Sequence, residues 1–166
     1  MLTVRCTRKL LRHLHADGHD GGPGATTRLG DWYGNLLFTR YMRLVICVSE
    51  RSLLPVFVEA KDSSSFVVKF RAAVRSVLER VGVSPDSIDS ELREMSTIAI
   101  GITQSRSVLG SLNELSFLAR YSVHLQSRTD LTALADEIAH TPCSALKYEN
   151  PKSMTLALLR ERSNDV

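Results

Sequence analysis

The sequence predicts an α+β domain in which a small antiparallel β-meander sheet packs against several helices. Three short β-like segments follow one another between residues 31 and 59, with no helical pattern between them. Most of the remaining chain places apolar side chains at three- and four-residue spacing, which indicates helices. Strands joined by hairpins, with helices grouped elsewhere along the chain, favour α+β over alternating β/α units.

The predicted meander consists of residues 31–38, 43–49 and 53–59, joined by short connections at 39–42 and 50–52. The middle segment is apolar at consecutive positions and so has two apolar faces. We therefore expect it to be the central strand. Pro55 cannot donate a hydrogen bond to a neighbouring strand, so the third segment is expected at an edge.

Before the meander, residues 4–6 form a short predicted strand, and a helix is expected from Thr7 to Leu14. The Thr7 hydroxyl can accept a hydrogen bond from the first helical turn. Leucines at positions 10, 11 and 14 share one face of that helix. Residues 16–28 contain four glycines and a proline and no large apolar side chain, which predicts a flexible loop.

After the meander, the serines at 63–65 can start a helix that continues to about Val81. A second helix is expected at Ser84-Pro85, since proline at the first helical position loses no hydrogen bond. Residues 97–103 are predicted to form a later strand. Further helices are predicted at residues 105–124, 130–140 and 151–162.

Length and composition indicate one domain over residues 1–166, long enough to bury a core of its own. The three cysteines are far apart and odd in number, which argues against a disulfide framework. No run approaches the ~20 apolar residues of a membrane span, and no secretory signal is recognisable. We therefore expect a cytoplasmic protein.

The charge is mildly positive and unevenly distributed. The formal net charge is +3, and the first 51 residues hold eight Lys and Arg against four Asp and Glu. The densest basic run consists of Arg5, Arg8, Lys9 and Arg12. Dedicated nucleic-acid binders usually have a denser basic stripe. Weak nucleic-acid binding is therefore a minor alternative, and another protein is the expected partner.

Three blocks of the sequence resemble one bacterial family that is known only as a domain of unknown function. The blocks are R-C-T-x-K-L-L at residues 5–11, G-D-W-Y-x-N at residues 30–35 and R-S-V-L-G-S-x-N at residues 106–113. Ser49 differs from the family pattern, in which asparagine is common at this position. The resemblance implies a bacterial cytosolic protein and supplies no activity.

Candidate binding residues lie in the meander and at the start of the helix after residue 103. Trp32 and Asn35 are three apart in a predicted strand, so they should point to opposite faces. Arg106 and Ser107 open a helix, where free N–H groups and the helix dipole can hold an anion. The alternative is a serine cap with an internal salt bridge. The candidate binding residues are Trp32, Asn35, Arg51, Arg106, Ser107 and Asn113.

No complete catalytic or metal-binding pattern is present. His13, His15 and His19, with neighbouring Asp17 and Asp20, have no second cluster of ligands, so we predict no metal site. Cys143 follows His140 but has no cationic partner to lower its pKa, and is expected to pack.

We therefore predict no catalytic residue and no cofactor. The expected function is a non-catalytic binding or interaction module. The alternative is an enzyme or sensor that binds an anionic small molecule or nucleotide near Arg106. The sequence leaves the oligomeric state open.

Overall fold

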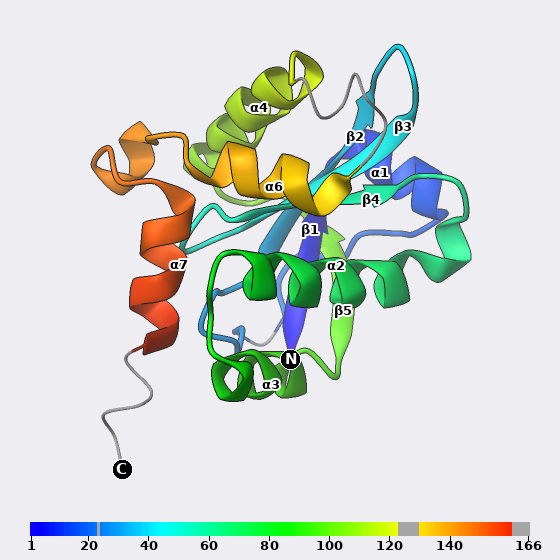
Figure 1. The fold of residues 1–166 in the computed structure, drawn as a ribbon. Coiled ribbons are helices and arrows are strands. Elements are labelled where there is room, and N and C mark those ends of the chain that lie inside the picture. Colours follow the sequence, from blue (N-terminus) through cyan, green and yellow to red (C-terminus); the bar gives the residue numbers. More distant parts are fainter. Residues whose placement is uncertain (23, 123–129, 161–166) are drawn as a thin grey trace.

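A five-stranded open sheet in the order β4-β3-β2-β1-β5 forms the centre of the fold (Figure 1). The computed structural model describes residues 1–22, 24–122 and 130–160. The strands are β1 (Leu2–Cys6), β2 (Trp32–Phe38), β3 (Arg43–Ser49), β4 (Pro55–Glu59) and β5 (Ile98–Ile102). The α+β class and the order of these elements along the chain agree with the prediction.

The sheet is mixed, which corrects the expected antiparallel sheet. Strands β2, β3 and β4 form the predicted antiparallel meander, with β3 in the middle and β4 at the edge that Pro55 indicated. Strand β1, however, pairs in parallel with both β2 and β5. Hairpins leave a local turn signal in the sequence, whereas parallel partners are joined by long crossovers. The spacing of residues along the sequence therefore gave no indication of the parallel pairings.

Helices cover both faces of the sheet. On one face lie α1 (Arg8–Leu14) and α2 (Phe66–Arg80). Here Leu10 packs so close to Gly34 that a Cβ at this glycine would lie 2.8 Å from the Leu10 Cδ2 atom. On the same face the Trp32 ring meets the Phe70 ring edge-on, with centroids 5.3 Å apart. Helix α4 (Arg106–Arg120) covers the opposite face, toward which Tyr33 points.

Helix α6 (Leu131–Ala139) protects the β4 edge. It contacts β4, α2 and α4, and in Figure 1 it lies between α2 and α4. An ion pair of 3.2 Å between Arg80 and Asp136 joins α2 to α6. Covering an edge strand in this way prevents it from pairing with another chain. The remaining elements are α3 (Pro85–Glu94), α7 (Pro151–Arg160), and the short 3₁₀ turns η1 (Ser63–Ser65) and η2 (Ser144–Leu146).

The predicted starts of α1 and α3 agree with the observed caps, whereas the serines expected to start α2 form the 3₁₀ turn η1, and Ser65 makes no capping hydrogen bond. Thr7 accepts a hydrogen bond from the Leu10 N–H, and Ser84 accepts one from the Ser87 N–H. Helix α4 ends at Arg120, earlier than the predicted 105–124. The last part of that predicted helix, and residues 161–162 of the last one, fall outside the described residues.

The glycine-rich loop runs along the free edge of β5. His19 forms a parallel bridge to Gly101, and the Gln104 side chain donates a hydrogen bond to Asp20. A Cβ at Gly101 would lie 2.7 Å from the Thr3 Cγ2 atom and 3.2 Å from the His19 oxygen. Glycine at this position therefore allows the loop to approach the strand.

Candidate functional site

A buried ion pair joins the first two sequence blocks. The Arg5 Nε atom lies 3.1 Å from Asp31 Oδ2, and both side chains are less than a tenth exposed. Asp31 Oδ1 also accepts a hydrogen bond from the Thr3 N–H at 2.9 Å. Arg5 Nη1 donates to the Ile102 carbonyl, so this pair connects β1, β5 and the start of β2. Sequence reasoning had placed both residues in motifs but did not pair them.

Two further contacts connect the blocks. The Thr7 hydroxyl donates a hydrogen bond of 2.6 Å to Asn35 Oδ1. The Tyr33 hydroxyl accepts one of 3.1 Å from the Ser105 N–H, just before α4. Asn35 therefore ties β2 to the β1–α1 junction. The motif residues hold one another in place, which accounts for their polar character in an otherwise apolar sheet.

Trp32 and Arg51 lie away from the start of α4. Trp32 is completely buried against Phe70. Arg51 is exposed and donates hydrogen bonds to the carbonyls of Thr27 and Arg28, so it holds the end of the loop. Because Ser49 pairs with Trp32 at the beginning of β2, Arg51 lies at the end of the sheet opposite Ser105.

The other three candidates share the outer side of α4. Arg106, Ser107 and Asn113 are all exposed. The Ser105 hydroxyl accepts a hydrogen bond of 3.2 Å from the Val108 N–H, as expected of a cap. The six predicted binding residues thus occupy several places in the fold, with one group of three on α4.

The outer side of α4 around Asn113 carries exposed aromatic side chains that the sequence analysis did not identify. Phe117 is 60% exposed and Tyr121 is 69% exposed, and their ring centroids lie 5.0 Å apart. Asn113, Glu114, Phe117 and Leu118 line a shallow, open and largely apolar depression on the outside of α4. We call these five residues the α4 surface. The signal was present in the sequence, since Phe117 and Tyr121 fall outside the apolar stripe of this helix that faces the sheet.

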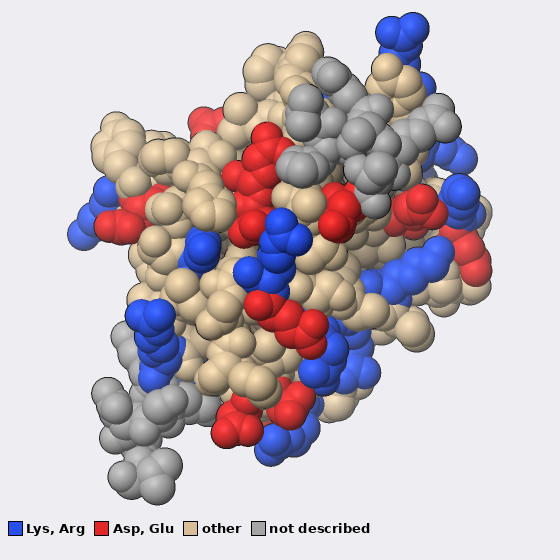
Figure 2. Space-filling view, in the orientation of Figure 1, with Lys and Arg blue, Asp and Glu red and all other residues tan. Residues whose placement is uncertain are grey.

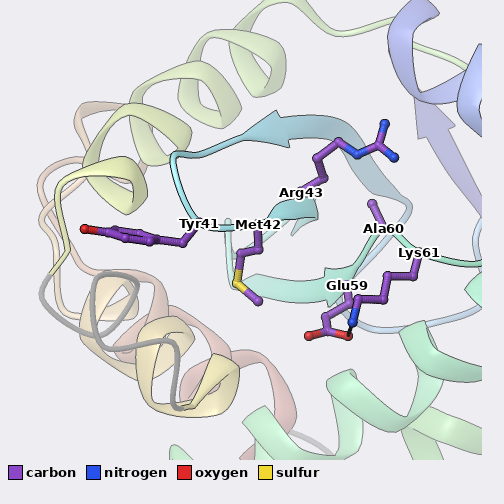
Figure 3. Close-up of a pocket in the computed structure, with 6 residues that line it drawn as sticks. All are labelled: Tyr41, Met42, Arg43, Glu59, Ala60 and Lys61. Atoms are coloured by element: carbon purple, nitrogen blue, oxygen red, sulfur yellow. Dashed lines mark ion pairs between the residues drawn. The ribbon is translucent and has the colours of Figure 1, made fainter.

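A second hollow of about 440 Å³ lies between the β2–β3 turn and the end of β4. Figure 3 shows that Tyr41 and Arg43 point to opposite sides of the turn. Lys61 and Glu59 form an exposed ion pair of 3.9 Å at the rim.

The cysteines are poorly suited to nucleophilic chemistry. Burial raises the pKa of the Cys6 thiol to about 12 and holds the pKa of the Cys47 thiol well above its ordinary value. Burial also raises the pKa of Cys143, and the nearby Glu114 carboxylate adds to this. Few thiolates would therefore be present at neutral pH.

The described residues contain neither a metal-binding cluster nor a membrane-spanning helix. Within residues 1–22, 24–122 and 130–160, His, Cys, Asp and Glu form no group of three or more that could hold a metal ion. In the same part of the chain, no helix has the length and apolar character needed to cross a membrane.

The comparison with family models bears on the three sequence blocks and the fold around them. The model of one family matches residues 3–154, which include all of β1 except Leu2, the other four strands and the whole of α4. The chain belongs to the family Domain of unknown function (DUF6933). This confirms the resemblance to an uncharacterised domain family. Neither the curated proteins nor the solved structures contain a match to this chain. Membership of DUF6933 therefore identifies relatives without assigning an activity.

Proposed function

We propose that this DUF6933 protein is a non-catalytic interaction module that binds another protein through the α4 surface. The observation that supports this most strongly is the pair of exposed aromatic rings, Phe117 and Tyr121. Aromatic side chains grouped on a helix and bordered by polar residues are typical of protein interfaces.

The packing of α4 supports this proposal. The inner face of the helix contacts β2 and β3 through Val108, Leu112 and Leu115, all buried. Folding therefore does not require aromatic residues on the outer face. Burying one large apolar side chain is worth about 1.5–3 kcal/mol, so a partner that covers both rings gains substantial affinity.

The buried, unpaired state of all three cysteines fits a reducing compartment. Together with the family resemblance, it supports assignment to a bacterial cytoplasm, which is part of the same proposal.

The test is to replace both rings. We expect Phe117→Ser with Tyr121→Ser to weaken binding of the partner by 30-fold or more, on the scale of about 2 kcal/mol for an interface hot spot. The melting temperature should change little. The partner is first captured on immobilised wild-type protein and identified, and its affinity for each variant is then measured by calorimetry.

Val68→Ser is the matched control, because Val68 is 73% exposed on α2 and outside the α4 surface. Affinity within twofold of wild type for the double variant would refute the proposed interface.

The second candidate function, binding of an anionic small molecule near Arg106, is favoured by the topology. Strands β1 and β5 are adjacent and parallel, and the helices that follow them leave on opposite faces of the sheet. Such a switch point is where open sheets bind ligands, beyond the carboxyl ends of the strands. Arg106 is exposed and forms no ion pair with any described residue.

For this candidate we expect Arg106→Ala to abolish binding of inorganic phosphate or a nucleotide, with the melting temperature nearly unchanged. Calorimetric titration measures the former and a thermal melt the latter. Arg93→Ala, which removes an exposed arginine from α3, serves as the control. If Arg106→Ala instead unfolds the protein, the arginine has a structural role and this candidate fails.

A further inference from the structure

Basic side chains gather at the end of the sheet where β1 and β2 finish. Figure 2 shows Lys and Arg side chains along the right-hand edge of the molecule, where Figure 1 places the β2–β3 hairpin and the start of α2. We call this the basic surface. Its exposed members are Arg8, Lys9, Arg12, Arg40, Arg43 and Lys61.

The folding of the chain brings these cations together from three segments. Helix α1 starts directly after β1, and it contacts both β2 and η1, which follows Lys61. Arg43 pairs with Phe38 at the end of β2, so both side chains lie on the sheet face that α1 covers. In Figure 3, Arg43 extends toward the side of α1. Arg8 and Arg12 border a hollow of about 530 Å³ on the outside of α1.

Three acidic residues lie among these cations, but their negative charge is smaller than the positive charge of the six cations. Asp17 lines the α1 hollow, and Glu59 is the partner of Lys61. Asp62 accepts hydrogen bonds from the Ser64 backbone and hydroxyl, which lower its pKa. The other five cations form no ion pair with a described residue. The surface is therefore net positive.

One exposed aromatic ring, Phe38, lies on the same sheet face as Arg43, and a second, Tyr41, points to the other side of the turn. Phe38 is 48% exposed at the end of β2. At the tip of the same hairpin, the Arg40 guanidinium lies 5.9 Å from the centroid of the Tyr41 ring. Cations that follow a phosphate backbone, beside rings on which bases stack, are the features of single-strand binding surfaces. A base within a duplex cannot stack on a protein ring unless it is unpaired.

We propose that the basic surface binds single-stranded nucleic acid, with Arg8 and Arg43 contacting phosphates and Phe38 stacking on a base. This function is separate from protein binding through α4, and the two surfaces can be tested independently.

The test measures binding of a fluorescein-labelled oligothymidylate of about 16 nucleotides by anisotropy, between about 50 and 200 mM salt. The logarithm of the association constant should fall linearly with the logarithm of salt concentration. Each cation that contacts a phosphate contributes about 0.7 to this slope for single strands. Arg8→Gln with Arg43→Gln should therefore reduce the slope by about 1.4.

Arg93→Gln with Arg120→Gln removes the same charge from exposed positions outside the basic surface and should leave the slope unchanged. Equal slopes for the two double variants would overturn the proposal.

Phe38→Ala should weaken binding about 5-fold to 150-fold, the range for loss of one stacked base, without changing the slope. Tyr148→Ala, at a residue 77% exposed elsewhere, is its control. Undiminished affinity of Phe38→Ala contradicts the stacking role. Equally tight binding of a matched duplex, or of phosphatidylserine vesicles, would overturn the assignment to single strands.

Discussion

Replacing Asp31 by alanine is expected to lower the free energy of unfolding by about 3–5 kcal/mol, because it leaves the Arg5 guanidinium buried without its counter-charge. The same change removes the acceptor of the Thr3 N–H. An unpaired buried donor adds its own desolvation cost. Urea denaturation followed by the fluorescence of Trp32, the single tryptophan of the chain, measures this loss.

The control for this prediction is Asp89→Ala, which removes the partner of Arg75. The N···O distance of the Arg75–Asp89 pair is 3.2 Å, close to the 3.1 Å of the Arg5–Asp31 pair. The side chains of Arg75 and Asp89, however, are about half exposed. An exposed pair contributes at most about 1 kcal/mol. Similar losses in the two variants would show that burial of the Arg5–Asp31 pair does not determine its importance.

Trp32→Ala is expected to lower the free energy of unfolding by about 3–5 kcal/mol, as for other large aromatic residues deleted from a core. Trp32 is fully buried and meets Phe70 edge-on. Trp32→Phe should cost much less, since it keeps a ring against Phe70. Among the described residues, the indole Nε1 atom has no hydrogen-bond partner to lose. Far-UV circular dichroism in urea is the appropriate measurement, because both variants lack the tryptophan.

This pair of variants distinguishes a core residue from a binding residue. If Trp32→Phe keeps the stability and the partner affinity of the wild type, Trp32 acts by packing. A stable Trp32→Phe variant that no longer binds the partner would instead assign the indole to the binding surface and contradict the packing role.

Local patterns predicted the elements because their causes are local. The Thr7, Ser84 and Ser105 caps satisfy N–H groups only three residues away. Pro55 marked an edge strand through the donor that it lacks. The meander was visible because its hairpins are short.

The candidate site was less predictable, because its residues meet through the fold. Trp32, Asn35 and Arg106 were all predicted to be binding residues. In the structure Trp32 faces α2, and Asn35 accepts a hydrogen bond from Thr7 at the end of β1. The exposure of Phe117 and Tyr121 follows from a helical projection of the sequence, but these residues belong to no chemical motif.

The amino-acid order by itself determined the order of helices and strands along the chain, which strand is central in the meander, and the excess of cations in the first third of the chain. Only the tertiary structure decided that β1 lies in parallel between β2 and β5, and that Arg5 reaches Asp31. It also gathered Arg8, Arg43 and Lys61 at one end of the sheet. Hydrogen bonding within a turn depends on neighbours in sequence, whereas pairing of distant strands depends on which apolar faces can be buried together.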